Sequence, residues 1–306
     1  MRIAVPDLIS NSYFPAVAAV DLGFFKVEGL DAELEMRSPI SRAMDALLGG
    51  EIEFVAGPAH GALSAFPDWK GVKLVAALAQ KTFWLLILRA DLGATPGDVS
   101  AVKGLRIGAA PGPEAAFRRL LTEAGIDLEK DNVQLGPVPR ASDQGVSFGV
   151  HAAKSLEEGI IDGFWANAMG SEVAVRSGAG QVILDGRRGI GPESAQDYTF
   201  AALVTSDNVI EKSPDDVAAA VRGIVRVQNA MRSDPSIATA VGERLFPPEE
   251  AAYIAALVER DLPFYDPRIS EEVVTALNRF AIDTGALSRD VPYDQVVATR
   301  FSGLWY

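Results

Sequence analysis

Short apolar runs alternate with stretches of helical periodicity over the first two thirds of the chain. This alternation is typical of βαβ units around a mainly parallel sheet. It predicts strands at residues 3–5, 32–36, 54–56, 72–77, 84–88, 105–109, 161–165 and 181–184. It also predicts helices that begin at Pro15, near Ser41, at Ala59, at Pro113, near Ser147 and near Gly170. Both prolines suit the first helical turn, where the missing N–H is not needed.

The same pattern occurs twice along this region. Residues 2–5 and 28–31 are echoed by residues 106–109 and 124–127, and the block at 50–56 then parallels the block at 159–166 with one residue inserted. Short Gly-apolar-acid patterns also recur by chance in α/β proteins. The paired order nevertheless favours two lobes of similar topology.

From about Tyr198 onward the pattern predicts helices alone. Ser213 and Pro214 suit an N-cap and a first helical position, and apolar residues follow at helical spacing as far as Met231. Two more helices are predicted over residues 248–260 and 270–282. A helical tail without strands is expected to pack back onto the first lobe.

Composition and charge exclude several classes of partner. The chain has 306 residues, which favours two domains, and its 48% hydrophobic and 23% charged residues are those of a globular protein. A net charge of −13 opposes binding to nucleic acid or to an anionic membrane surface. No apolar run approaches the roughly 20 residues that span a bilayer.

Metal and cofactor chemistry is not indicated. The chain has no Cys and two His, and neither a two-His helical spacing nor an acidic EF-hand loop occurs. The glycines between residues 104 and 112 form neither a Walker loop nor Gly-x-Gly-x-x-Gly. We therefore expect no metal and no cofactor. Met1 leads directly into an apolar segment, so the protein is periplasmic if a leader was trimmed and cytoplasmic if Met1 is the native start.

Three blocks in order resemble a known family. Residues 12–31 (SYFPAVAAVDLGFFKVEGLD) are similar to the opening of the substrate-binding proteins of nitrate, sulfonate and taurine transporters and of the NMT1/THI5-like group. Residues 46–55 and 99–108 resemble two later blocks of that family. The resemblance implies the α/β type 2 periplasmic-binding-protein fold, with two Rossmann-like lobes around a central cleft. Lobe 1 would comprise residues 1–86 plus 198–306, with the helical tail packed on it, and lobe 2 residues 87–197.

The resemblance also implies a function and an alternative. The first expectation is the solute-binding component of an ABC transporter, which binds a small organic ligand in the interlobe cleft and works with a permease. An anionic or heteroaromatic compound is one candidate ligand. The alternative is a cytoplasmic, cofactor-free decarboxylase or lyase acting on a small aromatic acid. A desulfinase relative uses a cysteine on the first loop, where this chain has Asn11-Ser12-Tyr13, and Ser12 without a neighbouring base is a poor nucleophile.

Candidate ligand-binding residues follow from the position of the loops. Ligands of open parallel sheets bind outside the carboxyl ends of the strands. In the first lobe and the first crossing this rule selects Ser10, Asn11, Ser12, Tyr13, Gly57, Pro58, Ala59, His60, Gln80, Lys81 and Thr82. In the second lobe and the return crossing it selects Ala110, Pro111, Gly112, Ser147, Phe148, Trp165, Asn167 and Tyr198.

Several of these residues allow more than one interpretation. Helices that begin at Ala59 and Pro113 would direct backbone N–H groups at an anion, although Glu114 and the negative net charge weigh against one.

His60, with the near-neutral pKa of an ordinary histidine, could act as a general acid or serve the local structure. His151 lies beside two alanines and suits a packed helix face. Trp165 ends a strand and is a better stacking candidate than Trp84.

The predicted grouping of segments can be tested by limited proteolysis. Cleavage near residue 88 should leave residues 1–87 associated with residues 210–306, because the tail is expected to complete the first lobe. Size-exclusion chromatography and mass spectrometry of the nicked protein would detect this association. Release of residues 1–87 as an independent stable domain would contradict it.

Overall fold

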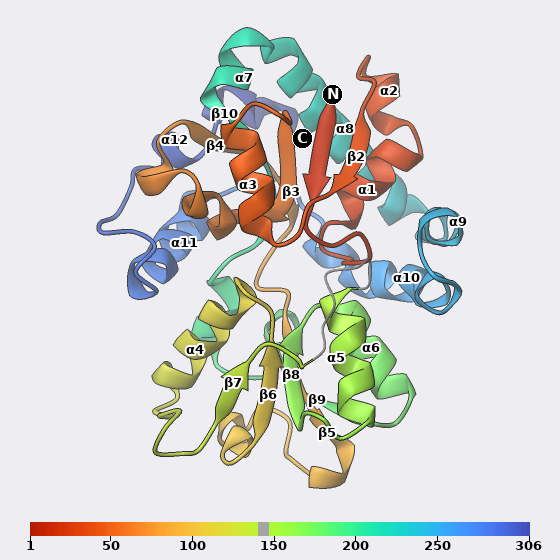
Figure 1. Ribbon diagram of the computed structural model, residues 1–306. Coiled ribbons are helices and arrows are strands. Elements are labelled where there is room, and N and C mark those ends of the chain that lie inside the picture. The colour runs from red at the N-terminus through yellow and green to blue at the C-terminus, as the bar shows by residue number, and fades with distance from the viewer. Residues whose placement is uncertain (140–146) are drawn as a thin grey trace. The chain divides into compact units, whose positions relative to one another are not determined.

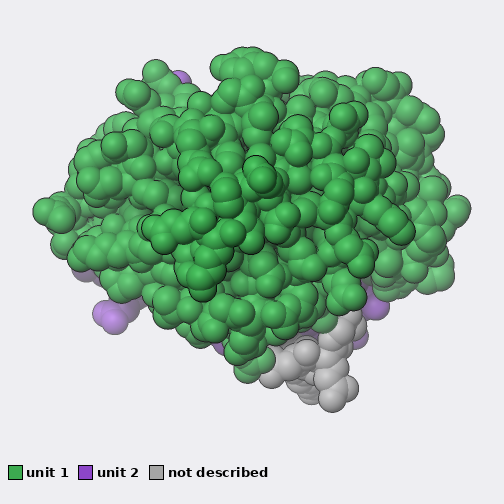
Figure 2. Space-filling view, turned by 90° about the horizontal axis from the view of Figure 1, so that it is seen from above, with its two compact units in different colours: residues 1–81, 199–306 green, residues 82–198 purple. Residues whose placement is uncertain are grey.

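A computed structural model describes residues 1–139 and 147–306 and divides the chain into two compact units (Figures 1 and 2). Unit 1 comprises Met1–Lys81 and Thr199–Tyr306, and unit 2 comprises Thr82–Tyr198. The chain thus passes between the units after residues 81 and 198, whereas the sequence placed these boundaries after residues 86 and 197. The earlier first boundary reflects residues 82–84, which lead directly into a strand of unit 2.

Unit 1 is built on a five-stranded sheet in the order β2-β1-β3-β10-β4. Its strands are β1 (Arg2–Val5), β2 (Glu33–Met36), β3 (Phe54–Pro58), β4 (Val72–Ala79) and β10 (Ala201–Ser206). β1 pairs in parallel with β2 and β3, and β10 lies antiparallel between β3 and β4. The side on which β1, β3 and β4 end is called the carboxyl end of the sheet below.

Strand β10 corrects the prediction that the chain after Tyr198 contains helices alone. All six residues of β10 are buried, because neighbours pair with it on both sides and helices cover the sheet. A strand buried on both faces shows no alternation of apolar and polar positions, and so short an apolar run cannot be told from a helix by periodicity. The sequence signal for this strand was therefore absent.

Unit 2 repeats the arrangement with the strand order β7-β6-β8-β5-β9. Its strands are β5 (Leu85–Arg89), β6 (Arg106–Ala109), β7 (Gln134–Gly136), β8 (Gly163–Ala166) and β9 (Gly180–Asp185). β6 pairs in parallel with β7 and β8, and β5 lies antiparallel between β8 and β9. The predicted repeat therefore corresponds to β1 with β6 and to β3 with β8. The three-residue strand β7 was not predicted.

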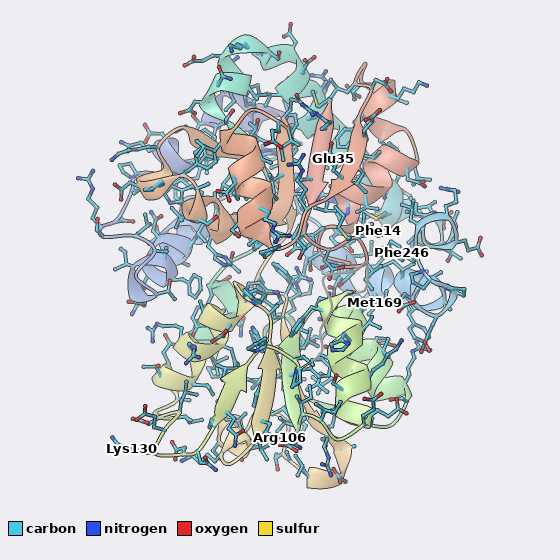
Figure 3. The ribbon with its side chains drawn as sticks, in the orientation of Figure 1. Phe14, Glu35, Arg106, Lys130, Met169 and Phe246 are labelled. Carbon is cyan, nitrogen blue, oxygen red and sulfur yellow. The ribbon has the colours of Figure 1, made fainter. Side chains whose placement is uncertain are left out.

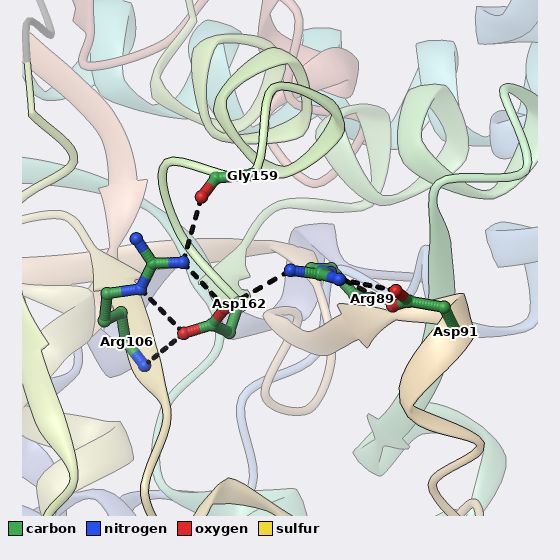
Figure 4. A network of polar contacts seen from close by, with 5 residues as sticks. All are labelled: Arg89, Asp91, Arg106, Gly159 and Asp162. Carbon is green, nitrogen blue, oxygen red and sulfur yellow. Dashed lines mark hydrogen bonds and ion pairs between the residues drawn. The ribbon is translucent and has the colours of Figure 1, made fainter.

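Each unit contains one pair of an arginine and an acidic residue at corresponding positions, and this pair explains part of the sequence repeat. The N–H of Arg2 donates to Glu53 Oε2 at 2.6 Å, and the N–H of Arg106 donates to Asp162 Oδ2 at 2.9 Å. In unit 2 the Arg106 guanidinium also donates to both oxygens of Asp162 at 2.8 Å, and Arg89 lies 3.6 Å from the same carboxylate (Figure 4). The Arg106 hydrogen bonds hold the pKa of Asp162 below its usual value. Both pairs fix the amino-terminal start of two neighbouring strands, so this repeat is structural.

Helices surround both sheets (Figure 1). Unit 2 contains α4 (Pro113–Glu123), α5 (Phe148–Glu157) and α6 (Ala168–Arg176). Unit 1 contains α1 (Phe14–Asp21), α2 (Phe24–Val27), α3 (Ile40–Leu48), α7 (Asp207–Lys212), α8 (Pro214–Ser233), α9 (Ile237–Leu245), α10 (Pro248–Asp261), α11 (Glu271–Asp283) and α12 (Tyr293–Val296). In the described part of the chain, no helix combines the length and the apolar character that crossing a bilayer requires.

The helical tail packs onto unit 1, as predicted. Helix α8 contacts α1 and α2, and Gln228 of α8 donates hydrogen bonds to the carbonyls of Ala77 and Leu78 in β4. Trp305 donates to the carbonyl of Val75 in the same strand at 2.9 Å. Phe14 and Phe246 lie edge to face with ring centroids 6.2 Å apart (Figure 3).

The ends of the tail helices agree with the predicted positions in part. Helix α8 begins at Pro214, but the side chain of Ser213 makes no capping hydrogen bond, because the residue departs from extended geometry (φ −136°, ψ 55°). Ser270 does cap α11, since its hydroxyl accepts from the N–H of Val273 at 3.3 Å. Helices α7 and α9 were not predicted.

Two glycines let α5 and α6 approach closely. A Cβ built on Gly170 would lie 2.3 Å from the carbonyl carbon of Gly149, which is shorter than any tolerated contact. Backbone atoms cannot move aside as a flexible side chain can. The packing of α5 on α6 therefore depends on the absence of a side chain at this position.

Gly170→Ala should lower the free energy of unfolding by about 2 to 3 kcal/mol, because the added methyl group overpacks a backbone contact. Gly136→Ala is the matched control, since a Cβ there meets nothing within 4 Å. It should change stability by less than about 0.5 kcal/mol. Urea denaturation of both variants measures the difference, and equal stabilities would contradict the close approach.

Candidate ligand-binding site

Each sheet contains one antiparallel strand, β10 in unit 1 and β5 in unit 2. Because this strand starts where its neighbours end, the chain segment that leads into it lies at the carboxyl end of the sheet. In unit 1, Ala201 at the start of β10 pairs with Pro58 and Ala79, which end β3 and β4. In unit 2, Leu85 at the start of β5 pairs with Ala166 and Asp185, which end β8 and β9. The segment just before β10 therefore lies at the same end of the sheet as the candidate loops of unit 1. The segment just before β5 lies likewise beside the candidate loops of unit 2.

The loop after β1 holds four buried candidates, Ser10, Asn11, Ser12 and Tyr13. The side-chain amide of Asn11 donates to Asp261 Oδ2 at 2.5 Å, and the hydroxyl of Tyr265 donates to the Asn11 carbonyl at 2.7 Å. Ser10 and Asn11 are each 1% exposed, and neither Ser10 Oγ nor Asn11 Oδ1 has a hydrogen-bond partner among the described residues. Such an atom costs about 1 to 3 kcal/mol, so two in one loop need an explanation.

The candidates after β3 lie against the start of β10. Gly57 and Pro58 belong to β3 itself, and the N–H of Ala59 donates to the carbonyl of Phe200 at 2.9 Å. The helix predicted to begin at Ala59 is a 3₁₀ helix of six residues, Ala59–Ser64. A helix this short, with one N–H already used by Phe200, gives little support to the predicted anion site at Ala59.

His60 is bound to the return segment of the chain. Its Nδ1 lies 2.9 Å from Oγ1 of Thr199, and its ring contacts Phe280 edge to face at 5.4 Å. Burial lowers the pKa of His60 to about 4. The imidazole is therefore neutral at pH 7, which corrects the expectation of a near-neutral pKa and argues against a general-acid role.

The end of α10 and the segment between α10 and α11 contribute residues that the sequence did not indicate. Asp261 and Tyr265 hold Asn11, as described above, and the backbone carbonyls of residues 264, 266 and 268 hold Gln80. The side-chain amide of Gln80 donates to the latter two carbonyls at 3.0 and 2.6 Å. Lys81 follows in the left-handed region (φ 63°). The signal was missed because Asp261 and Tyr265 are about 250 residues from Asn11 in sequence.

In unit 2, several candidate polar groups serve the local structure. Asn167 accepts from the N–H of Gly170 at 3.0 Å, which caps α6, and its amide donates to Ser147 Oγ at 3.2 Å. Phe148 is the half-buried first residue of α5. The carbonyl of Ala110 accepts from the N–H of Glu114, Pro111 is exposed, and Gly112 has a positive φ of 97° before α4.

Tyr198 and His151 are also engaged inside unit 2. The hydroxyl of Tyr198 donates to Glu123, which also pairs with Arg119 at 2.6 Å. Burial and this hydrogen bond raise the pKa of Tyr198 above its usual value. His151 Nε2 lies 3.2 Å from the carbonyl of Pro139, which agrees with the structural interpretation of that residue.

Thr82 and Trp165 are the remaining candidates of unit 2. Trp165 stacks on Phe117 with ring centroids 5.2 Å apart, and Trp84 lies 6.3 Å from it. The N–H of Thr82 donates to the carbonyl of Gln196 at 2.7 Å. Thr82 Oγ1 and Trp165 Nε1 are buried and have no hydrogen-bond partner among the described residues. Those residues also contain no cluster of three or more His, Asp or Glu suited to a metal.

Solved structures of low sequence identity share this fold. A protein of Bordetella bronchiseptica RB50 matches with a TM-score of 0.74 at 20% identity, over 98% of this chain and 92% of that protein. The periplasmic aliphatic sulphonate binding protein SsuA from Escherichia coli matches with a TM-score of 0.71 at 13% identity, over 97% and 91%. The desulfurization enzyme DSZB matches with a TM-score of 0.64 at 15% identity, over 99% and 97%. The chain therefore has the type 2 periplasmic-binding-protein fold.

The family follows from the sequence itself. A model of the NMT1/THI5-like family matches residues 10–238, which is most of the chain. The chain belongs to the NMT1/THI5-like family, and the resemblance inferred from its three blocks is confirmed. No curated protein matches the sequence at a significant level.

The partly buried imidazole of His60 should make stability depend on pH. The pKa of His60 is about 4 in the folded protein and 6.5 in its ordinary state, so the unfolded chain binds the proton first. The contribution to stability is complete above about pH 6.5 and is lost as the pH falls toward 4. Between pH 7 and 5 the loss should be roughly 2 kcal/mol.

Denaturation of the wild type and His60→Asn at both pH values measures this contribution. His60→Asn should lose roughly 2 kcal/mol less than the wild type between pH 7 and 5. Identical pH dependence in the two proteins would contradict the lowered pKa of His60.

Proposed function

We propose that this protein is the solute-binding component of an ABC importer and that it binds a small organic ligand at the carboxyl ends of its strands. Membership of the NMT1/THI5-like family and the type 2 periplasmic-binding-protein fold support the proposal. Solved structures of this fold include SsuA proteins described as periplasmic sulfonate-binding proteins of an ABC transporter. A transporter permease would be the partner of the loaded protein.

The observation that carries the proposal is the polar loop after β1. Ser10 Oγ and Asn11 Oδ1 are buried at the carboxyl end of β1 without a partner among the described residues. Unpartnered polar atoms lower the stability of a hydrophobic core. A ligand that forms hydrogen bonds with them would offset that free-energy cost. The support from Asp261 and Tyr265 fixes the loop before the ligand arrives, which reduces the entropy lost on binding.

The same atoms indicate which hydrogen-bonding groups a ligand would present to unit 1. Asn11 Oδ1 can only accept a hydrogen bond, and Ser10 can donate or accept. The carboxylate of Asp261 lies directly behind the Asn11 amide. That carboxylate is itself paired with the Arg260 guanidinium at 3.9 Å, so the acceptor-only Asn11 Oδ1 carries the argument, and the ligand would present an N–H or O–H donor to it. An uncharged or heteroaromatic ligand fits this end better than a sulfonate.

Catalysis is less well supported than binding. The match to DSZB makes the fold compatible with an enzyme. The chain has no Cys to act as a thiol nucleophile, however. The candidate His60 is neutral at pH 7, because its pKa is lowered to about 4, and it is bound to Thr199.

Ser10→Ala should weaken binding of the molecule that copurifies with the protein by about 5-fold to 150-fold, the cost of leaving a buried ligand group unpaired. It should leave the stability of the empty protein unchanged or higher, because it removes an unpartnered hydroxyl. Native mass spectrometry identifies the copurifying molecule, and calorimetric titration of the stripped protein measures its affinity.

Ser206→Ala is the matched control. Ser206 caps α7 at the opposite end of the sheet, where it pairs with Val72 at the start of β4. This change should lower stability by about 1 kcal/mol and leave affinity unchanged. Unchanged affinity in Ser10→Ala, together with a lower stability of the empty protein, would show that the loop holds the fold and not a ligand.

A further inference from the structure

His60 and Thr199 meet at the carboxyl end of the unit 1 sheet. His60 lies just after the end of β3, and Thr199 lies just before the start of β10. These two strands are paired, and the N–H of Ala59 extends the pairing by donating to the carbonyl of Phe200 at 2.9 Å. The sheet therefore fixes the two side chains beside each other, and both belong to unit 1.

The hydroxyl of Thr199 has two possible acceptors for its single proton among the described residues. Its Oγ1 lies 2.9 Å from Nδ1 of His60 and 3.5 Å from the carbonyl oxygen of Phe200. Hydrogen bonds between a hydroxyl and an oxygen are typically about 2.5 to 3.0 Å long, so the contact with the carbonyl is too long to be strong. The proton is therefore best placed on the bond to Nδ1.

The opposite arrangement leaves a buried donor poorly satisfied. If Nδ1 carried the ring proton, it would donate to Oγ1, and the Thr199 hydroxyl would have to donate to Phe200 across 3.5 Å. That carbonyl already accepts from Ala59, and Thr199 is only 1% exposed, so water is not a ready substitute. A flipped imidazole would place a C–H group against Oγ1 with the same result. Because an unsatisfied buried donor costs free energy, Nδ1 is the acceptor.

The imidazole carries one proton and is held in one orientation. Burial lowers the pKa of His60 to about 4, so the ring is neutral at pH 7. The ring packs edge to face on Phe280, with centroids 5.4 Å apart and planes at 84°. In a neutral imidazole one nitrogen donates and the other accepts, and the hydrogen bond at one nitrogen determines the role of the other. With Nδ1 accepting, the ring proton lies on Nε2.

We propose that Thr199 is a positioning residue that holds His60 in the tautomer with its proton on Nε2, so that His60 enters the ligand-binding site as a hydrogen-bond donor. The proposal deepens the proposed function and rests on it for the presence of a ligand at this end of the sheet. A ligand group that meets Nε2 is then an acceptor, such as a carbonyl oxygen or a ring nitrogen. Asn11, which follows the neighbouring strand β1, has an amide oxygen that can only accept. Unit 1 thus offers both kinds of hydrogen-bonding group.

Nitrogen-15 NMR of the ligand-free protein at pH 7 reads the tautomer directly. Protonated and unprotonated ring nitrogens of a neutral histidine have well-separated shifts, and Nε2 is recognised because it couples strongly to both ring C–H protons whereas Nδ1 couples strongly to one. The chain has two His, so a His151→Asn variant assigns the signals of His60. The expected result is a protonated Nε2 and an unprotonated Nδ1 in His60.

Thr199→Val tests the role of the hydroxyl, because it keeps the shape of the side chain and removes the donor. The Nδ1 signal of His60 should then move downfield, as expected when an unprotonated ring nitrogen loses a hydrogen-bond donor. Thr199→Ser retains a hydroxyl and should keep the wild-type Nδ1 signal. His151 lies in unit 2 against the carbonyl of Pro139, so its signals should be the same in all of these proteins.

Three outcomes would overturn the proposal. A proton on Nδ1 in the wild type would make His60 an acceptor at Nε2. A charged imidazolium at pH 7 would leave no tautomer to fix. An unchanged Nδ1 signal in Thr199→Val would remove Thr199 from the role, and the measurements on the wild type stand even if this variant does not fold. None of these experiments uses a ligand, so they fail separately from the proposed function, which the effect of Ser10→Ala on affinity tests.

Discussion

One antiparallel strand in each sheet determines where the chemistry of this protein lies. β10 lies between β3 and β4, and β5 lies between β8 and β9. Since each runs against its neighbours, each must begin where they end, and the chain that leads into it must arrive at the carboxyl end of the sheet. This constraint places Thr199 beside His60 and Thr82 in the same pocket as Trp165. The connections between the units therefore supply site residues as well as linking the units.

The sequence predicted those parts of the fold that have a periodic or repeated signal. The repeat at residues 2–5 and 106–109 corresponds to β1 and β6, and the prolines at 214 and 248 mark the starts of α8 and α10. Strand β10 was missed because a strand buried on both faces has no alternation. Of the candidate site, the loops after the strands could be predicted from topology alone. The roles of Asp261 and Tyr265 could not, because they depend on a tertiary contact across most of the chain.

The candidate residues divide into those that build the site and those that remain available to a ligand. Asn167 caps a helix, Gln80 binds backbone carbonyls and Tyr198 binds Glu123. Ser10 Oγ, Asn11 Oδ1, Thr82 Oγ1 and Trp165 Nε1 are buried without partners in the described part of the chain. Unpartnered atoms of this kind reduce stability, and proteins commonly retain such costs at functional sites. In unit 1 these atoms are a hydroxyl and an amide oxygen that can only accept, and in unit 2 they are a hydroxyl and an indole N–H that can only donate.

The central claim is that a ligand completes the hydrogen bonding of the loop after β1. A crystal structure of the protein purified without removal of its bound molecule tests this claim most directly. The account predicts ligand atoms about 2.7 to 3.2 Å from Ser10 Oγ and from Asn11 Oδ1. A ligand bound away from this loop, or ordered water alone on both atoms in a protein that has retained its ligand, would contradict the account.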